Sequence, residues 1–323
     1  MPNSSIKKIL IVGAGQIGQR HLESILQSKI NVSIVIVDSS DNSLDRAKKF
    51  LKDLNIKKAL LKVYWKKTLT SENNFFDIAI IATSSKNRAN IIKKISDKIQ
   101  INYWIIEKIL AQSKKEINLI ETKLVNAKGV WVNTPRRLMT WHKKLKNQIH
   151  NKGILSVKMV GGLWGICCNS IHFIDLVCWY TGEKLISINT NNLNQSWIKS
   201  KRNGYFEVTG DLYAYFSSGT KLLLRSNPKI KKRYLYVKFA DKKTITIDED
   251  EGVAFGNKKY ILKGKLKLQS QMTGPMISKI LTKGVCELPT LHESAEQHKI
   301  FINAMLNHWN TYNKCKDKKV PIT

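Results

Sequence analysis

The sequence has few acidic side chains. Its 323 residues include 24 Asp and Glu against 55 Lys and Arg, which gives a formal net charge of +31 at pH 7. Such a surplus suggests a nucleic-acid partner, but the lysines are spread over nearly every segment and none of the dense patches lies in a recognisable nucleic-acid module. We therefore expect a mostly solvated basic surface without specific nucleic-acid binding. The charge would favour an anionic small substrate.

Long apolar runs, a disulfide pattern and internal repeats are missing as well. No apolar run reaches membrane-spanning length, so we expect no membrane partner, and residues 1–5 lead into the first strand without the pattern of a signal peptide. The cysteines number five, and two of them are adjacent, which does not suggest a disulfide framework. A reducing cytoplasm is the simplest setting.

Three glycines near the start organise the rest of the chain. Gly13, Gly15 and Gly18 have the spacing G-x-G-x-x-G, after an apolar β-branched run and before a segment with apolar residues at helical spacing. This order predicts a strand, a tight turn and a helix. Gly13 permits the turn, Gly15 leaves room for a pyrophosphate at the backbone, and Gly18 lets the helix pack close to the strand. The helix N-terminus would then face the phosphates.

An acidic residue follows at the distance that such a site requires. A second apolar strand over residues 32–37 ends in Asp38, 20 residues after Gly18. A carboxylate there can accept a hydrogen bond from the ribose 2′-hydroxyl of an adenosine and would repel a 2′-phosphate. We therefore predict NAD in preference to NADP. The alternative is an Asp that merely caps the next helix.

The first part of the chain alternates strands and helices. We expect helices at 44–54, 87–99 and 114–127, and strands at 59–64, 75–83, 101–106 and 130–132. This repetition predicts an α/β domain over residues 1–132, a Rossmann doubly wound parallel sheet with right-handed crossovers. Ligands of such sheets lie at the carboxyl ends of the strands.

After Asn133 the pattern changes to strand-like runs with few helices. We expect helices at 137–149, 169–180 and 291–307, and strands at 155–160, 185–190, 205–216, 220–225, 234–239 and 244–247. These runs predict an α+β domain over residues 133–323 with a large, mainly antiparallel sheet. The final helix could pack back on the first domain. An exposed face of the sheet would suit a homo-oligomer.

Several motifs together resemble the glucose-fructose oxidoreductase / inositol dehydrogenase family, written Gfo/Idh/MocA. The resemblance covers nearly the whole length and rests on the following segments: residues 13–18 with Arg20 and His21, 77–83, Glu107-Lys108, 133–137, 169–175 and 288–290. Residues 15–21, with Trp164-Gly165 ahead of 169–175, are most similar to members associated with bacterial surface-polysaccharide sugars. The resemblance implies an NAD-dependent oxidoreductase that acts on a sugar or nucleotide sugar.

The same resemblance implies the catalytic pair Lys108 and His172, which flank the reacting sugar carbon. The chemistry suits them, because oxidising a secondary alcohol removes a hydroxyl proton as hydride leaves. Histidine is a base near neutral pH, and an ammonium can stabilise alkoxide character. The alternatives are a packed core histidine beside Trp179 and an ordinary strand-end lysine.

The remaining predicted contacts fall into two sets. For substrate we predict Arg136, Arg137, Asn169 and Asp175. The two arginines could bind a phosphate or carboxylate, and the alternative for them is a solvated helix start. The alternative for Asp175 is a charge on the helix surface. For cofactor we predict the following residues: Gly13, Gly15, Gln16, Ile17, Gly18, Asp38, Thr83, Ser84, Asn87, Glu107 and Lys108.

Two departures from the family pattern affect this prediction. Ile109 stands where the family has a proline after the lysine, and Cys168 stands where many members have an Asp one turn before the histidine. Cys168 and His172 also have a metal-ligand spacing, but no convincing further ligands accompany them, and we predict no metal. The alternative function is a catalytically weak NAD-binding sensor or scaffold on the same fold.

Overall fold

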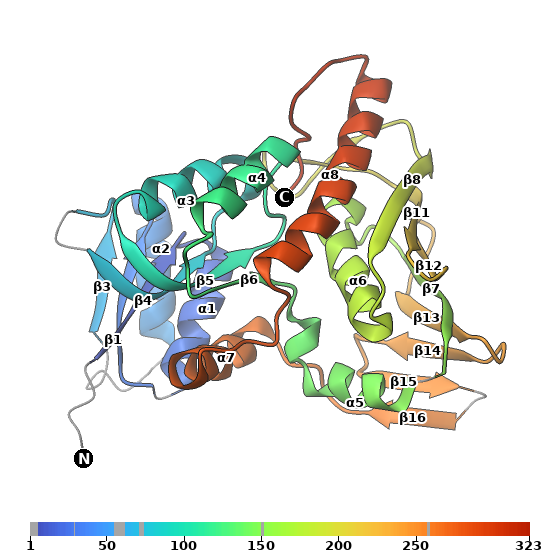
Figure 1. Cartoon of the computed structure of the whole chain (residues 1–323), viewed down its shortest axis with the longest axis horizontal. Coiled ribbons are helices and arrows are strands. Elements are labelled where there is room, and N and C mark those ends of the chain that lie inside the picture. Colours follow the sequence, from blue (N-terminus) through green and yellow to red (C-terminus); the bar gives the residue numbers. More distant parts are fainter. Residues whose placement is uncertain (1–5, 29, 55–61, 71–73, 150–151, 257–258) are drawn as a thin grey trace. The chain divides into compact units, whose positions relative to one another are not determined.

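The computed structural model describes residues 6–28, 30–54, 62–70, 74–149, 152–256 and 259–323 (Figure 1). The chain forms two compact units, each built from several stretches of sequence. The first unit comprises Met1–Leu110, Asn118–Asn133 and Lys267–Leu291. The second comprises Ala111–Ile117, Thr134–Leu266 and His292–Thr323.

A six-stranded, wholly parallel sheet is the centre of the first unit, in the order β3-β2-β1-β4-β5-β6. Its strands are β1 (Lys7–Val12), β2 (Val32–Val37), β3 (Lys62–Lys66), β4 (Phe75–Ile81), β5 (Gln100–Glu107) and β6 (Gly129–Asn133). The helices between them are α1 (Gln16–Gln27), α2 (Asp41–Asp53), α3 (Arg88–Ser96) and α4 (Lys114–Lys123). The strand order reverses beside β1, which is where such sheets bind ligands.

Both faces of this sheet are covered by helices, and its central strands are apolar on both faces. Residues 78–81 of β4 are completely buried, as expected for a parallel sheet. A later helix, α7 (Gln269–Lys283), lies against α1 on the face opposite α3 (Figure 1). The contact is close because a Cβ at Gly274 would lie 2.3 Å from the carbonyl oxygen of Ser24, whose hydroxyl accepts the Gly274 N–H at 2.8 Å.

An eight-stranded sheet is the centre of the second unit, in the order β16-β15-β14-β13-β7-β12-β11-β8. All its neighbouring strands are antiparallel except β7 and β12. Its strands are β7 (Ile154–Gly161), β8 (Leu185–Leu193), β11 (Gly210–Phe216), β12 (Lys221–Ser226), β13 (Tyr234–Phe239), β14 (Thr244–Asp248), β15 (Val253–Gly256) and β16 (Lys259–Lys263), and a separate ribbon pairs β9 (Ile198–Lys199) with β10 (Phe206–Glu207). The helices are α5 (Thr140–Ile149), α6 (Ile166–Thr181) and α8 (Leu291–Asn313).

Helix α6 packs on β7 and β12 in the middle of the sheet. Ten of its residues are buried, and it ends at Gly182, which has a φ of +77° and donates its N–H to the carbonyl of Cys178. Side chains alternate between buried and half-buried along β11, β12 and β13. One sheet face therefore forms the core of the unit, and association of copies through the other face stays a prediction.

The predicted fold class is confirmed: a parallel Rossmann sheet precedes a large, mainly antiparallel one. The boundary between residues 132 and 133 and the packing of the final helix stay predictions. Helix α7 was not predicted, because Gly274 and Pro275 lie inside it. The single strand expected over 205–216 is divided before Gly210, whose φ is +108°. Residues 59–61 of the expected strand 59–64 lie outside the described part.

None of the helices in the described residues has the length and apolar character needed to cross a membrane.

Candidate active site

The glycine turn has the shape that a dinucleotide phosphate needs. Gly13 has a φ of +105°, and a Cβ there would lie 2.9 Å from the Ala82 backbone. A Cβ at Gly18 would lie 1.9 Å from the carbonyl oxygen of Gly13, whereas a Cβ at Gly15 would meet nothing within 4 Å. Gly13 and Gly18 are thus required by the fold itself. Gly15 leaves open space at the N-terminus of α1, where backbone N–H groups favour an anion.

Asp38 at the end of β2 has a structural task that the sequence did not reveal. Its Oδ2 accepts the N–H of Ala14 at 2.8 Å, and its Oδ1 accepts the N–H of Ser40 at 2.9 Å. The carboxylate therefore joins the glycine turn to the end of β2. A carboxylate oxygen can accept more than one hydrogen bond, so Asp38 retains acceptor capacity for a ribose hydroxyl.

A pocket of about 1020 Å³ opens at this edge of the parallel sheet. Gly13, Asp38, Thr83 and Asn87 are the predicted cofactor residues in its lining. Its walls include, besides these, Val12, Val37, Ser39, Lys67, Thr68, Leu69, Thr70, Ile91, Lys94, Ile95, Lys98 and Ile99. The Thr83 hydroxyl is buried and has no hydrogen-bond partner among the described residues. A mainly apolar pocket with an orphaned hydroxyl and an acceptor carboxylate fits an adenosine ribose.

Glu107, at the end of β5, belongs to a closed ring of buried and half-buried polar side chains. Its Oε1 accepts from His21 Nε2 at 2.9 Å and from Asn133 Nδ2 at 2.5 Å. The ring closes through Gln269, 3.1 Å from Asn133 Nδ2, and through Thr273, whose hydroxyl is 2.9 Å from Gln269 Nε2 and 2.8 Å from His21 Nδ1. Burial opposes ionisation of Glu107, but His21, Asn133 and the charge of Lys108 outweigh it and hold its pKa below the ordinary value.

Lys108 follows this ring directly and is half-buried. It stands at the carboxyl end of β5, and the Lys108–Ile109 peptide bond is cis. The guanidinium of the buried Arg88 donates to the backbone carbonyls of Glu107, Ile109 and Thr83. Lys108, Glu107 and Ser84 lie at the strand ends, outside the lining of the described pocket. Of the glycine-turn residues, Gly15, Gln16, Ile17 and Gly18 are likewise outside it.

His172 lies half-buried on α6 of the second unit, in the second turn of the helix. The start of α6 is capped from β10, because the Glu207 carboxylate accepts the N–H groups of Cys167 at 2.7 Å and Cys168 at 3.0 Å. The predicted substrate residue Asn169 donates its side-chain N–H to the carbonyl of Trp164 at 2.7 Å. A carboxylate is thus present at the helix start although residue 168 itself is a cysteine.

Asp175 and Arg137 form a buried, bidentate ion pair in the second unit. Arg137 donates through Nη2 to Oδ1 at 2.6 Å and through Nε to Oδ2 at 3.1 Å. The Thr134 hydroxyl donates to the same Oδ2 at 2.8 Å. This pair ties the turn at residues 134–137 to α6, one turn after His172. In the described structure both predicted substrate residues therefore hold the fold around His172.

The neighbouring Arg136 is engaged in the same way by Glu249. Its Nε and Nη2 lie 2.7 and 2.6 Å from the two carboxylate oxygens. His142 contacts Glu249 Oε1 at 2.9 Å through Nε2 and the hydroxyl of Tyr180 at 2.7 Å through Nδ1. Burial disfavours ionised Glu249, but Arg136 and His142 hold its pKa well below the ordinary value. Burial lowers the pKa of His142.

This network predicts that the second unit loses stability on acidification from pH 6.5. A histidine whose folded pKa is lowered contributes stability that is fully present above its unfolded pKa and is lost as the pH falls toward the folded value. For one group the slope is at most about 1.4 kcal/mol per pH unit. We expect His142→Gln, which cannot titrate, to flatten unfolding free energy against pH between 6.5 and 5, measured by urea denaturation. An unchanged slope would contradict the assignment.

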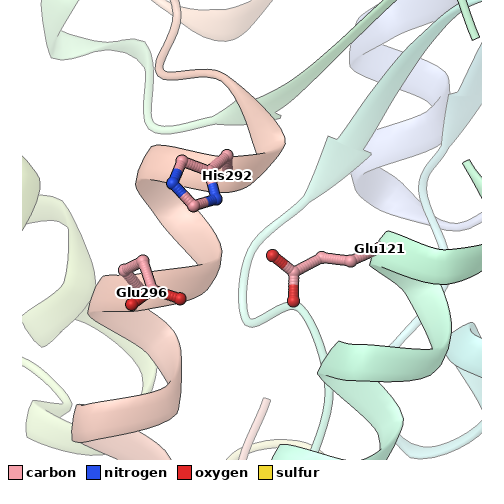
Figure 2. Close-up of side chains that lie close together, drawn as sticks. All are labelled: Glu121, His292 and Glu296. Carbon is pink, nitrogen blue, oxygen red and sulfur yellow. The ribbon is translucent and has the colours of Figure 1, made fainter. Parts of the chain in front are cut away.

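Three side chains that could ligate a metal come from helices α4 and α8. Figure 2 shows His292 and Glu296 one turn apart on α8 and Glu121 on α4. His292 and Glu296 are exposed and belong to the second unit, whereas Glu121 belongs to the first. Within the described residues of either unit taken alone, no three His, Cys, Asp or Glu side chains converge. The absence of a metal stays a prediction.

The glycine turn, Asp38 and the pocket define a dinucleotide-binding Rossmann domain of the oxidoreductase type. Residues 7–134 match the GFO_IDH_MocA family model, described as an oxidoreductase family with an NAD-binding Rossmann fold. The match over these residues confirms this part of the resemblance to the Gfo/Idh/MocA family. No curated protein matches the chain.

Solved structures of the same fold cover almost the whole chain. The scyllo-inositol dehydrogenase of Lactobacillus casei, solved with NAD(H) and scyllo-inositol, has a TM-score of 0.65 at 15% identity and covers 94% of this chain and 97% of its own. The myo-inositol 2-dehydrogenase of Lactobacillus plantarum has a TM-score of 0.67 at 15% identity and covers 99% of this chain and 100% of its own. Biliverdin reductase of Synechocystis sp. PCC 6803, solved with biliverdin and NADP+, has a TM-score of 0.67 at 13% identity and covers 92% of this chain and 97% of its own.

Sequence reasoning did not assign several residues that the structure places at the strand ends or around α6. His21 was part of the resemblance but had no role, and Arg88, Asn133, His142 and Glu249 had none either. Most of their partners lie between 19 and 252 residues away in the sequence. No local spacing signals such contacts.

Proposed function

We propose that the protein is an NAD-dependent oxidoreductase that transfers a hydride between nicotinamide and a secondary alcohol or ketone of a sugar or nucleotide sugar, in the synthesis of a surface polysaccharide. The observation that carries the proposal is the pocket beside the glycine turn, with Asp38 at its rim and the orphaned Thr83 hydroxyl in its wall. The family match of residues 7–134 supports the redox class. The basic surface favours an anionic substrate such as a nucleotide sugar.

Asp38 supports NAD as the cofactor. Both of its oxygens accept backbone N–H groups, and the negative charge of a carboxylate repels a 2′-phosphate. The fold is compatible with either cofactor, because similar structures carry NAD(H) and NADP+. We therefore expect tighter binding of NADH than of NADPH.

In the proposed mechanism His172 accepts the hydroxyl proton of the substrate and Lys108 donates a hydrogen bond to the same oxygen. The bound cofactor supplies a two-electron hydride acceptor. Glu207 fixes the start of the helix that carries His172, and the Arg137–Asp175 pair fixes its next turn. Glu107, held by His21 and Asn133, fixes the strand end that carries Lys108. Each catalytic side chain thus stands on a backbone held by buried bonds.

The test combines binding and turnover on purified protein. NADH and NADPH are titrated by fluorescence, and NADH formation is then followed with UDP-, GDP- and CMP-linked sugars, inositols and biliverdin, the last in the reductive direction. We expect turnover with one sugar class, reduced by about a thousandfold in His172→Ala and Lys108→Ala, since acid-base catalysis contributes about 10²–10⁴-fold and one oxyanion donor about 10²–10³-fold. Both variants should still bind NADH.

The other outcomes would indicate a different substrate or a different function. Turnover of biliverdin alone would retain the redox class and refute a sugar substrate. Bound NADH without turnover over the whole panel would favour the sensor or scaffold function. Absence of NADH binding would refute the proposal.

A further inference from the structure

We propose that Arg88 is a positioning residue for Lys108, acting through the backbone on both sides of that lysine. The inference rests on the proposed function, in which Lys108 contacts the reacting oxygen. Arg88 is the first residue of α3 and is 1% exposed. Its Nη1 donates to the carbonyl of Glu107 at 2.6 Å and also to the carbonyl of Ile109, and its Nη2 donates to the carbonyl of Thr83.

The two carbonyls at Nη1 bracket Lys108, one from the residue before it and one from the residue after it. Backbone beyond the end of a strand has no ladder partner to hold it. The guanidinium supplies that restraint here, and the ring around Glu107 restrains the preceding side chain. The Lys108 Cα is therefore held through the backbone on both sides of it, and this restraint does not involve the lysine side chain.

The third carbonyl connects this restraint to the cofactor pocket. Thr83 lines the pocket, and its hydroxyl is the orphaned group in the wall. One rigid planar group thus sets the distance between the Lys108 backbone and the pocket wall. Arginine suits the task because its donors diverge in a fixed plane and can reach three acceptors, whereas a lysine ammonium is a single point on a flexible stem.

Burying a guanidinium costs free energy that carbonyl acceptors offset only in part. A purely structural link between α3 and β5 could be made by apolar packing. The arrangement is therefore better explained by a requirement for precise geometry at Lys108 than by a gain in stability. Precise geometry is the usual reason why a site needs supporting contacts.

The experiment measures Lys108 directly, so it requires no substrate. Each lysine is labelled with trace acetic anhydride from pH 7 to 11, with and without saturating NADH, and labelling is quantified for each peptide by mass spectrometry. The variant is Arg88→Lys, which keeps the positive charge but loses the divergent N–H donors of the guanidinium. The matched control is Arg46→Lys, an exposed arginine on α2 whose hydrogen bond is a 3.4 Å contact to the Ser43 hydroxyl.

We expect Arg88→Lys to change the labelling rate of Lys108 by about tenfold, while Lys86 and Lys114 label as in the wild type, because a change of one unit in the pKa of an amine changes its unprotonated fraction by about tenfold. Arg46→Lys should leave all rates unchanged. An unaltered Lys108 profile in folded Arg88→Lys would overturn the inference. Slower labelling of Lys108 in the presence of NADH tests the proposed function separately. If NADH did not slow the labelling of wild-type Lys108, the proposed function would be contradicted, whereas the effect of Arg88→Lys could still be measured.

A second measurement on the unaltered protein covers the case in which Arg88→Lys does not fold. If Arg88 holds this turn, amides of residues 107–111 should exchange with deuterium as slowly as those of β5, and NADH should not slow them further. Fast exchange that becomes slow only with NADH would overturn the inference, because the turn would then be ordered by the cofactor.

Discussion

Gly15→Ala should lose NADH affinity while its melting temperature stays that of the wild type. A Cβ at Gly15 meets no protein atom within 4 Å, and its φ of −68° is accessible to alanine. The methyl group would project into the space that we assign to the pyrophosphate. Losing one or two charge-assisted hydrogen bonds there weakens binding roughly tenfold to hundredfold. Fluorescence titration with NADH and thermal unfolding measure the two quantities.

Gly18→Ala is the matched comparison, because the same added methyl group meets the fold itself. Its Cβ would lie 1.9 Å from the Gly13 carbonyl oxygen, which is backbone and cannot move aside as a side chain could. We expect a loss of about 3 kcal/mol in unfolding free energy, together with loss of NADH binding. Wild-type NADH affinity in Gly15→Ala would show that the open space is not the phosphate site.

Arg137→Met should destabilise the second unit by about 3–5 kcal/mol, because it leaves the carboxylate of Asp175 buried without its counter-charge. The two side chains are 9% and 1% exposed, and they share two hydrogen bonds. For a unit of this size the change corresponds to a fall of roughly 10 °C in melting temperature. Urea denaturation followed by circular dichroism measures it.

Arg225→Met provides the control with the same geometry at the surface. Arg225 also meets a carboxylate through Nε and Nη2, at 2.7 and 2.5 Å from Asp211, but its side chain is 39% exposed. Exposed pairs contribute up to about 1 kcal/mol. Equal losses in the two variants would mean that burial of the Arg137–Asp175 pair is not the cause.

The first sheet could be predicted from the sequence because its signals are local. The glycine spacing, the apolar run of β4 and the acid after β2 each lie within a few residues, and together they indicate the parallel order and the ligand edge. Helix α7 could not be predicted in the same way. Its Gly274 is required by a carbonyl oxygen 250 residues earlier in the sequence, so the residue that looks like a helix breaker is a packing requirement.

The grouping of predicted cofactor residues at one edge could be predicted from the sequence, whereas the contacts that support the site could not, and the cofactor role itself stays a prediction. Gly13, Asp38, Thr83 and Asn87 were expected at one edge and line one pocket. The arginines at 136 and 137 were expected to face a substrate because adjacent guanidinium groups after a turn suit anions. Their carboxylate partners, Glu249 and Asp175, come from 113 and 38 residues away, and only the folded chain brings them together. Whether either arginine also contacts substrate stays a prediction.

The return of α7 to the first unit has a consequence for how the protein is made. The chain enters the first unit three times, and the last entry ends at Leu291. While the ribosome is still synthesising the large antiparallel sheet, the side of α1 that carries His21 and Ser24 has no partner, since Thr273 and Gly274 have not emerged. The helical layer over the Rossmann sheet must therefore remain incomplete until nearly the whole polypeptide has been translated, and a shortened gene encoding only the first 132 residues would yield a protein whose helix α1 lacks its α7 partner.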